Sequence, residues 1–290
     1  MKSGTLPFHG WKDLSRHQFF SICLLLIATN LLLIGTDNIK VTAAEQPCIG
    51  DTPCPLGDRS YHVLPPDNWD GKTRLPVLLY FHGWGRQGPV PLNHKHIGGA
   101  TRKTGVLLIA PNGLGKSWDF WRPGSRDTEF AKEVLADVEE SYPLDRSKLF
   151  VSGYSWGSSM AWRFSCEAGD QVSVLLGISG TFYDQNEECK TGPVEVRHVH
   201  GLTDTVMDFP YGPNGEETGP VHLWARTNGC GPDPDEKSSW KARQTFTHYA
   251  WKDCKSGKSI SLDVHGGGHW IAKHWMAKQL KELLNRKSSS

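Results

Sequence analysis

The residue best suited to covalent chemistry in this sequence is Ser155, in the Gly-Tyr-Ser-Trp-Gly motif at 153–157. An apolar run at 148–152 leads into the motif, and a helix-like segment follows it. A serine at the tip of a sharp strand-to-helix turn has a strained backbone, and a Cβ atom at either glycine would crowd the turn. Such a short motif also arises by chance, but its flanks favour a nucleophile elbow at Ser155.

A serine nucleophile needs a histidine to take its proton and a carboxylate to orient that histidine. In hydrolases with such an elbow, the acid and then the histidine follow the serine, each after a later strand. Asp204 meets this requirement, because it lies in a loop just after an apolar run that ends at His200. We therefore expect the acid at Asp204, with Asp208 in the same loop as the alternative.

The candidate base is His269, which follows three glycines at 266–268 after a further apolar run. Glycines give the backbone the freedom to bring a side chain back over the edge of a sheet. His265 is the alternative base, but it lies inside the expected strand. A histidine beside a tryptophan is in itself more often structural, so the prediction depends on the order of the three candidates in the chain.

The oxyanion of an acyl-transfer intermediate needs preorganised N–H donors. The backbone N–H of Trp156, directly after the nucleophile, is the expected first donor. The second is expected from Trp84, in the loop after the apolar run at 77–81. Most tryptophans of the chain are expected in the core. Trp84, Trp156 and Trp270 adjoin the candidate catalytic positions, so we expect their indoles to contact substrate.

The elements that must position these residues follow the pattern of an α/β fold. Continuous apolar runs are typical of strands covered on both faces, as in a mainly parallel sheet, and they occur at 77–81, 105–110 and 148–152. Apolar residues at helical spacing predict a helix over 128–142, capped by Asp127. Further strands are expected at 172–178, 194–200 and 259–265, and a closing amphipathic helix at 270–286. The sequence therefore predicts one domain with helices on both faces of a central sheet.

Residues 1–44 form a segment of a different kind. Three basic residues precede an apolar run at 19–35, and the small residues Ala43 and Ala44 follow, as at a signal-peptidase site. This pattern predicts an export signal, with an uncleaved membrane anchor as the alternative because polar residues interrupt the run. The catalytic domain is then expected to comprise residues 45–290 of a secreted or periplasmic protein.

The charge of the chain argues against some classes of partner. The full sequence has 32 basic and 31 acidic residues; without the four basic and two acidic residues of the first 44, 28 and 29 remain. No basic excess indicates a nucleic-acid partner, and no second apolar run of about 18 residues indicates another membrane span. We expect contact with a membrane only if the N-terminal segment stays uncleaved.

Six cysteines follow residue 44, and an even number in an exported chain is typical of disulfides. Many pairings are possible in principle, and proximity in the sequence favours Cys48 with Cys54, Cys166 with Cys189, and Cys230 with Cys254. The alternatives are a metal site or reduced buried thiols. No Cys-x-x-Cys pair occurs, so we expect no zinc site.

These motifs, in this order, resemble the secreted polyhydroxybutyrate depolymerase and feruloyl esterase type of α/β-hydrolase, a family that also includes acetylxylan esterases. The resemblance covers most of residues 59–270, and its matching segments are 75–79, 82–83, 145–155, 160–161, 200–204, 228–230 and 266–269. It implies the triad Ser155, Asp204 and His269. It also supports the pairings Cys166 with Cys189 and Cys230 with Cys254.

The sequence departs from the family pattern close to the nucleophile. Trp156 stands where a small or polar residue is usual, and Trp84 stands where a smaller residue is common. Ser158 replaces the second glycine that usually follows Gly157. Two bulky indoles beside the serine would narrow or reshape the acyl pocket, so the reaction class is easier to predict than the substrate.

The sequence thus predicts a secreted serine carboxylesterase that forms an acyl-enzyme at Ser155 and needs no metal or organic cofactor. Its expected substrates are hydroxyalkanoate oligomers or feruloyl and acetyl esters of sugars. A serine peptidase on the same scaffold is one alternative, and a non-catalytic protein that binds glycan or polyester is the other. Turnover of p-nitrophenyl acetate without peptide cleavage argues against the first, whereas ligand binding without ester turnover supports the second.

Overall fold

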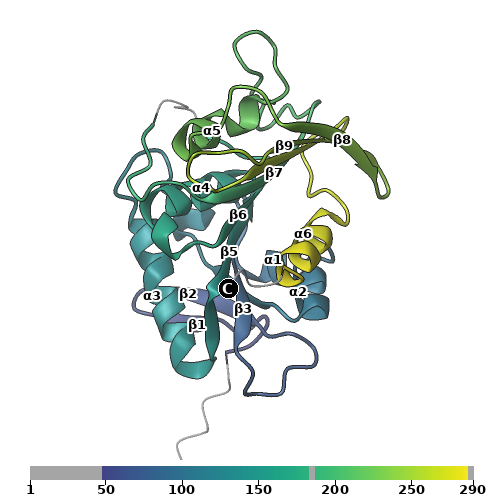
Figure 1. Cartoon of the computed structure of the whole chain (residues 1–290). Helices are drawn as coiled ribbons and strands as arrows, with labels where there is room; N and C mark the ends of the chain where they lie inside the picture. The colour runs from purple at the N-terminus through teal and green to yellow at the C-terminus, as the bar shows by residue number, and fades with distance from the viewer. Residues whose placement is uncertain (1–47, 183–186, 287–290) are drawn as a thin grey trace, which may run out of the picture. The chain divides into compact units, whose positions relative to one another are not determined.

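The computed structural model of the protein describes residues 48–182 and 187–286, which form a single α/β domain (Figure 1). The export signal or anchor expected at 1–44 lies outside the described residues. Across the two described ranges, no helix combines the length and the apolar character needed to cross a membrane.

A ten-stranded sheet organises the described part of the chain, in the order β1-β2-β4-β3-β5-β6-β7-β10-β9-β8. The strands from β4 to β10 in this order run parallel, and antiparallel strands extend the sheet at both edges. The prediction of a mainly parallel central sheet is therefore confirmed. The strands are β1 (Cys54–Leu56), β2 (Arg59–Leu64), β3 (Leu75–Phe81), β4 (Leu107–Pro111), β5 (Leu144–Tyr154), β6 (Val174–Ile178), β7 (Glu195–Gly201), β8 (Glu236–Lys241), β9 (Thr245–Trp251) and β10 (Ile260–His265).

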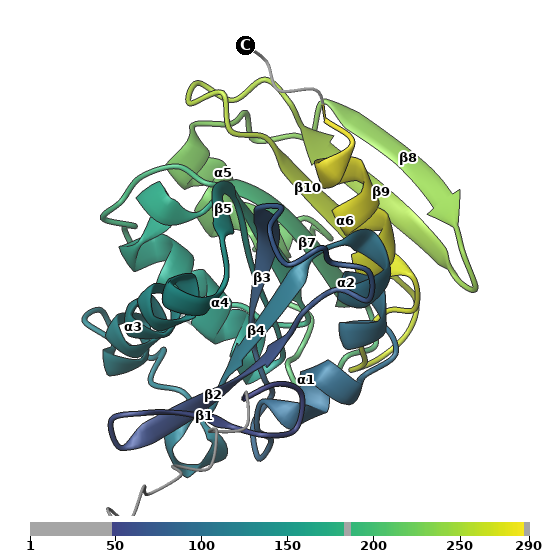
Figure 2. The same ribbon diagram turned by 90° about the horizontal axis from the view of Figure 1, so that it is seen from below.

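Helices cover both faces of the sheet, because successive side chains of the central strands point to opposite faces and are apolar on both. In β3, Val77 and Leu79 pack in one buried cluster, with side chains of α3, α4 and α5, and Leu78 packs in the other, with side chains of α2 and α6. Figure 2 shows these two helix layers on either side of the strands. The helices are α1 (Pro89–Asn93), α2 (Gly98–Thr104), α3 (Arg126–Ser141), α4 (Trp156–Glu167), α5 (His222–Asn228) and α6 (Trp275–Leu284).

The start of α3 corrects one prediction. The helix is capped by Ser125, whose Oγ accepts a hydrogen bond of 3.2 Å from the backbone N–H of Asp127. Asp127 does not cap the helix, because its carboxylate is buried and pairs with Arg59 at 2.7 Å. An acidic residue in the first turn of a helix also suits the positive end of the helix dipole.

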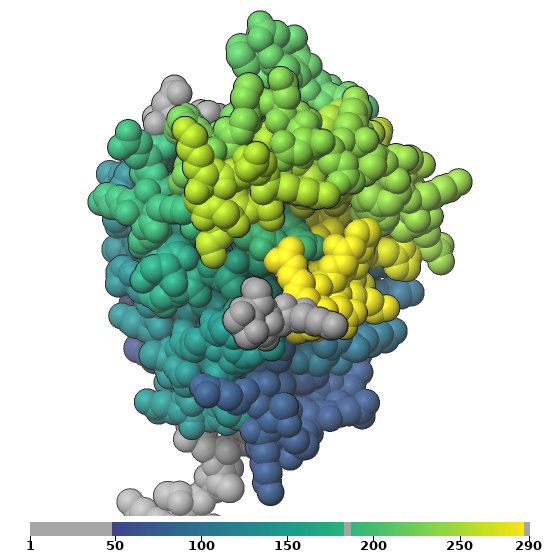
Figure 3. Space-filling view, in the orientation of Figure 1, coloured from purple at the N-terminus to yellow at the C-terminus, as the bar shows by residue number. Residues whose placement is uncertain are grey.

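The closing helix is shorter than predicted and begins at Trp275. The residue before it, His274, has a positive φ of 67°, so the chain turns there before the helix starts. Helix α6 packs against α2, and in the space-filling view its yellow surface meets blue surface from the first part of the chain (Figure 3). The early and late parts of the sequence thus close one face of the sheet together.

The antiparallel edge strands were not predicted. Strand β8 is largely exposed along its length, and β1 has only three residues. Neither has the continuous apolar run of a strand covered on both faces, which was the signal used to predict the central strands. Charged residues at such an edge also protect it from pairing with another chain.

Candidate active site

Ser155 lies at the turn between β5 and α4, where its backbone has φ 58° and ψ −126°. This conformation is strained for a residue with a side chain, and the surrounding packing holds it in place. A Cβ atom at Gly153 would lie 2.1 Å from the carbonyl oxygen of Gly157, and one at Gly157 would lie 2.0 Å from that of Phe81. Both glycines are therefore required by close backbone approach, and the turn presents Ser155 at the carboxyl end of β5.

Asp204 lies in the loop that follows β7, and its side chain is fully buried. Its Oδ2 lies 2.7 Å from Nδ1 of His269. Its Oδ1 accepts hydrogen bonds of 2.9 Å from the backbone N–H groups of Val206 and Met207. The loop thus holds the carboxylate in a fixed orientation, with one oxygen bound to backbone and the other facing the imidazole.

The environment of Asp204 favours its charged form. Burial alone would raise the pKa of this carboxyl, but the hydrogen bonds from His200 and His269 and from the backbone N–H groups outweigh that effect. The pKa of Asp204 is therefore held well below its ordinary value. A permanent negative charge at this position stabilises positive charge on the imidazole of His269.

His269 lies in the loop between β10 and α6, beside the carboxyl end of β5. Its ring packs on the ring of Tyr154 with centroids 4.7 Å apart, and the Tyr154 hydroxyl donates a 2.9 Å hydrogen bond to the His269 backbone carbonyl. Burial raises the pKa of Tyr154 to about 12, so its hydroxyl stays protonated and able to donate. Because Nδ1 of His269 faces Asp204, its Nε2 is left to exchange protons with a substrate or a nucleophile.

A cavity of about 680 Å³ is lined by both Ser155 and His269. Within the described ranges no hydrogen bond joins the two side chains to each other, and such catalytic contacts often tighten only when substrate binds. The structure thus brings Ser155, His269 and Asp204 to one edge of the sheet, at the carboxyl ends of β5, β10 and β7. This is the edge at which open α/β sheets bind their ligands.

The two alternative residues lie outside this arrangement. Asp208 is exposed to solvent. His265 is buried at the end of β10, where its Nδ1 accepts a 3.1 Å hydrogen bond from the backbone N–H of Gly267. Burial lowers the pKa of His265 to about 4, so its ring is neutral at pH 7. Its ring stacks on the indole of Trp270, so it supports the wall of the cavity.

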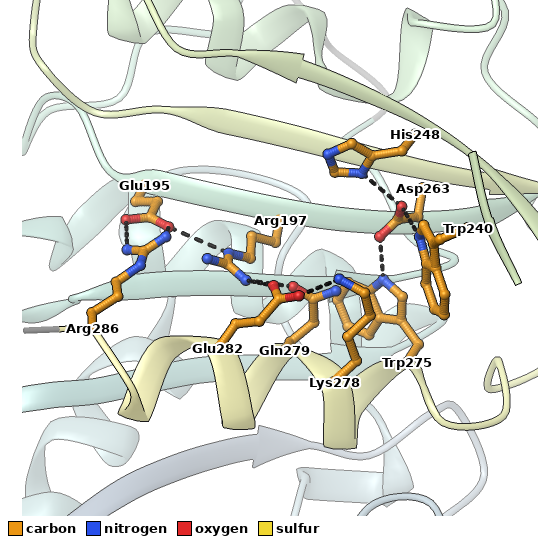
Figure 4. A network of polar contacts seen from close by, with 10 residues as sticks. All are labelled: Glu195, Arg197, Trp240, His248, Asp263, Trp275, Lys278, Gln279, Glu282 and Arg286. Carbon is orange, nitrogen blue, oxygen red and sulfur yellow. Dashed lines mark hydrogen bonds and ion pairs between the residues drawn. The ribbon is translucent and has the colours of Figure 1, made fainter. Parts of the chain in front are cut away.

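A polar network anchors the loop that carries His269 (Figure 4). The buried carboxylate of Asp263, on β10, accepts hydrogen bonds from the indole of Trp240 at 2.8 Å and from the ring of His248 at 2.8 Å. It also accepts one of 2.7 Å from the indole of Trp275, the first residue of α6. Asp263 was not among the residues predicted from the sequence. The available signal was an acidic residue inside an otherwise apolar strand, which must find partners when buried.

The loop after β3 runs beside the nucleophile. A Cβ atom at Gly83 would lie 3.8 Å from the Cβ atom of Ser155, so the next residue, Trp84, is close to the reacting centre. His82 fixes this loop, because its Nδ1 donates to the Gly83 carbonyl at 2.9 Å and its Nε2 accepts from the Gly113 N–H at 3.0 Å. Burial lowers the pKa of His82 to about 4, which matches this neutral form.

The two N–H groups expected to bind an oxyanion belong to Trp84 and Trp156. Trp156 begins α4, so its N–H is one of the helix-terminal donors without a helical acceptor. No group in residues 48–182 or 187–286 accepts a hydrogen bond from the backbone N–H of Trp84 or of Trp156.

Aromatic side chains form much of the cavity wall. Trp84, Trp156 and Trp270, the three indoles expected to contact substrate, all line it. Trp84 is 66% exposed, and its ring lies 5.7 Å from that of Trp156. Trp156 also meets Trp121, with centroids 5.3 Å apart and the planes nearly perpendicular. Trp121 was not among the indoles expected to contact substrate, since it lies far from the motif in sequence.

Three disulfides hold the domain together, and they link Cys48 with Cys54, Cys166 with Cys189, and Cys230 with Cys254. These are the pairs that proximity in the sequence favoured. The second disulfide ties the last turn of α4, the helix that follows Ser155, to the loop before β7. Within the described residues, no group of three or more potential metal ligands is placed to hold an ion.

Comparison with known proteins identifies relatives of the chain. No protein-family profile matches it. A probable feruloyl esterase C of Aspergillus clavatus is 29% identical over 243 residues, which cover 78% of this chain and 80% of that protein. A bifunctional acetylxylan esterase/xylanase of Neocallimastix patriciarum is 24% identical over 216 residues, which cover 73% of this chain and 31% of that protein.

A comparison of structures agrees with these relatives on the fold. An acetyl xylan esterase from Aspergillus awamori superimposes with a TM-score of 0.60 at 15% identity, covering 77% of this chain and 93% of that structure. The chain is therefore a homologue of feruloyl and acetylxylan esterases, a hydrolase of carboxylic ester bonds with the α/β-hydrolase fold.

Proposed function

We propose that this esterase cleaves its substrate through a triad of Ser155, His269 and Asp204. The observation that carries the proposal is the 2.7 Å contact between the buried Asp204 and His269, because His269 lines a cavity together with the strained Ser155. A carboxylate, an imidazole and a serine hydroxyl at the carboxyl ends of neighbouring strands are the groups that acyl transfer needs.

In the proposed mechanism, His269 takes the proton of the Ser155 hydroxyl as its oxygen attacks the ester carbonyl. Asp204 holds Nδ1 of the imidazole and stabilises the imidazolium that forms. The backbone N–H groups of Trp84 and Trp156 bind the oxyanion, and loss of one such donor costs about 10²–10³ in rate. The imidazolium then protonates the departing alcohol, and water repeats the sequence to release the acid.

We further propose that the natural substrates are feruloyl or acetyl esters of sugars and that the protein is secreted. The names of the relatives support the substrate class. The aromatic wall of Trp84 and Trp156 supports it too, because indoles bind both aromatic rings and sugar faces. The three disulfides support export, since such bonds persist in oxidising compartments. We propose residues 1–44 as the export signal and residues 45–290 as the catalytic domain.

A fluorophosphonate probe tests the mechanism directly. The wild-type protein should be labelled at Ser155, and Ser155→Ala should abolish both labelling and hydrolysis of p-nitrophenyl acetate. A folded protein that is not labelled would rule out the proposal. A panel of acetyl, butyryl, hydroxybutyrate-oligomer and feruloyl esters then tests the substrate class, with a peptide substrate included to detect peptidase activity.

A further inference from the structure

The cavity that contains Ser155 has an uneven distribution of charge. Among the described residues that line it, none is acidic, and Arg86 contributes a guanidinium group. The side chain of Arg86 is exposed, and within residues 48–182 and 187–286 it takes part in no ion pair or hydrogen bond. A permanent positive charge therefore borders the space in which the ester binds, and no carboxylate of the described chain is paired with it.

The loop after β3 holds Arg86 close to the nucleophile. The backbone N–H of Arg86 donates a 3.2 Å hydrogen bond to the carbonyl of Gly83, which closes a turn and keeps the two Cα atoms within about 7 Å of each other. The N–H of Gly85 donates at 2.8 Å to the carbonyl of Lys116, so the turn is also tied from outside. Because a Cβ atom at Gly83 would lie 3.8 Å from that of Ser155, the turn places Arg86 beside the reacting centre.

His94 is a second polar group in the wall of this cavity, and it lies directly after α1. Its Nδ1 accepts a hydrogen bond of 3.3 Å from the backbone N–H of His96. Burial lowers the pKa of His94, so its ring is neutral at pH 7 and its proton is on Nε2. His94 can therefore donate an N–H to a ligand oxygen without first gaining a charge.

Further basic groups lie behind His94. The ring of His96 has its centroid 5.6 Å from that of His94 and 5.8 Å from that of His274, so the segment after α1 meets the residue that precedes α6. Burial lowers the pKa of His96, and the surrounding basic groups lower it further, namely His94, His274, Lys95 and Lys273. Two loops thus bring positive charge to one side of the cavity, and such a field raises the local concentration of anions.

The acids of the neighbouring segments do not offset this charge inside the cavity. Asp204 is buried and bound to His269, and Asp51 accepts a 2.7 Å hydrogen bond from the side chain of Asn93. Asp208 is exposed, and none of the three acids lines the cavity. The whole chain has 32 basic and 31 acidic residues, so the positive charge is a property of this site and not of the overall composition.

The two groups in the cavity wall match one negative charge. The guanidinium of Arg86 has a planar pair of N–H donors that fits the two oxygens of a carboxylate. The Nε2–H of His94 adds one neutral donor. A phosphate monoester carries about 1.5–2 negative charges at pH 7 and has three strong acceptor oxygens, which is more than these two groups match.

We propose that Arg86 and His94 bind a carboxylate that the substrate carries in addition to the ester that is cleaved. The inference rests on the proposed function and deepens it, because it gives the substrate a negative charge. The same two residues serve a carboxylate on the acyl part or on the alcohol part of the ester. They contribute binding and selectivity, and the acyl transfer remains at Ser155.

The test uses two pairs of esters, and the members of each pair differ only in a carboxylate or a carboxamide. The first pair is the p-nitrophenyl ester of adipic acid and that of adipic acid monoamide, with the extra group on the acyl part. The second pair is the acetate esters of 4-hydroxybenzoate and 4-hydroxybenzamide, with the extra group on the alcohol part. The quantity measured is the selectivity ratio, kcat/KM for the carboxylate divided by kcat/KM for the carboxamide.

The wild-type selectivity ratio should be about ten in at least one pair, and the pair that shows it assigns the carboxylate to the acyl or the alcohol part. Arg86→Gln should lower that ratio about tenfold, which corresponds to about 1.4 kcal/mol. Arg86→Lys keeps the charge but not the planar pair of donors, so it should retain part of the ratio. His94→Phe removes one neutral donor and should lower the ratio about threefold.

Salt tests the contribution of the surrounding charge. Raising NaCl from about 0.02 M to about 0.5 M should lower the wild-type selectivity ratio, because salt screens exposed charges. The double variant Lys95→Gln/Lys273→Gln should show a weaker dependence on salt, since both side chains are exposed and neither lines the cavity.

Arg146→Gln is the matched control for the loss of one arginine. Arg146 lies near the start of β5, whereas Ser155 follows its end, and it pairs with Glu139 at 2.6 Å. Its selectivity ratio should equal that of the wild type. A wild-type ratio near one in both pairs, a ratio that Arg86→Gln leaves unchanged, or an equal loss in Arg146→Gln would overturn the carboxylate site. If the folded wild type hydrolyses none of the four esters, the proposed function fails instead.

Discussion

The indole N–H of Trp275 donates a 2.7 Å hydrogen bond to Oδ2 of Asp263, and His269 lies midway in the twelve-residue interval between them. This bond joins the end of β10 to the start of α6 at the base of the loop that carries the candidate base. Trp240 and His248 donate to the other oxygen of Asp263 from the β8–β9 hairpin, which lies outside the loop. The three donors therefore share one acceptor, but Trp275 holds the loop of His269, whereas Trp240 and His248 hold the β8–β9 hairpin.

Substitution of the two tryptophans separates these roles. Trp275→Phe keeps an aromatic ring but removes the bond that closes the His269 loop, so kcat should fall about tenfold to a hundredfold as the imidazole loses its position. Both Trp275→Phe and Trp240→Phe leave Asp263 short of one hydrogen bond, so each should lower the free energy of unfolding by about 1–3 kcal/mol. Trp240→Phe should leave kcat unchanged. Steady-state kinetics and urea unfolding measure the two effects, and equal kcat losses in both variants would contradict the prediction.

Replacement of the buried acid tests its role in orienting His269. Asp204→Asn keeps the size of the side chain but removes the charge and presents an amide to the imidazole, which selects the wrong tautomer. We expect kcat for p-nitrophenyl acetate to fall by about 10⁴. Asp208→Asn is the matched control in the same loop and should retain wild-type kcat, because that side chain is exposed. Loss of activity in Asp208→Asn with retention in Asp204→Asn would reverse the assignment.

The last glycine of the nucleophile motif is expected to be irreplaceable on steric grounds. Gly157→Ala would place a Cβ atom 2.0 Å from the carbonyl oxygen of Phe81, and the backbone on both sides is part of the sheet and helix core. We expect a loss of at least about 3 kcal/mol in unfolding free energy, or no folded protein. Gly99→Ala, in helix α2 with no atom within 4 Å of the new Cβ, should instead be neutral or stabilising by about 0.5–1 kcal/mol. Thermal unfolding of the two variants tests the contrast.

Acid should destabilise the fold through two buried histidines. Burial lowers the pKa of His82 and of His265 from 6.5 to about 4. Between these values the unfolded chain binds protons that the folded protein does not, so stability is full above pH 6.5 and falls as the pH drops towards about 4. Each lowered pKa is worth about 3 kcal/mol over that range. Urea unfolding as a function of pH should show this slope, and His82→Gln should reduce it.

A pH-independent free energy of unfolding between these two values would contradict the neutral, buried state of both rings. The opposite slope, with greater stability in acid, would mean that the rings are charged in the folded protein.

The parts of the fold that the sequence predicted are those with a strong local signal. The runs at 77–81, 105–110 and 148–152 became β3, β4 and β5, because strands covered on both faces must be apolar throughout. The exposed edge strand β8 gave no such signal. In the sequence, Asp127 resembles a helix cap. In the structure it lies in the first turn of α3, and its side chain is buried because it pairs with Arg59, which is far away in the chain.

The same distinction between strong and absent local signals applies to the residues of the candidate site. Ser155, Asp204 and His269 could be proposed from motif and order, because loops at strand ends converge on one edge of a parallel sheet. Asp263 could not, since its contact with Trp275 is one that no local pattern encodes. Residues that support a site through tertiary contacts can be identified only once their neighbours in the structure are known.

The pairing of β7 with β10 has a consequence for how this enzyme can change. These two strands are adjacent and parallel, and they carry Asp204 and His269 at matching ends, although 65 positions separate the two residues in the chain. Between β7 and β10 in the chain, the β8–β9 hairpin extends the sheet at its border. The hairpin can therefore gain or lose residues during evolution, and new surface can form there. The pairing of β7 with β10 keeps Asp204 and His269 in the same relative position meanwhile.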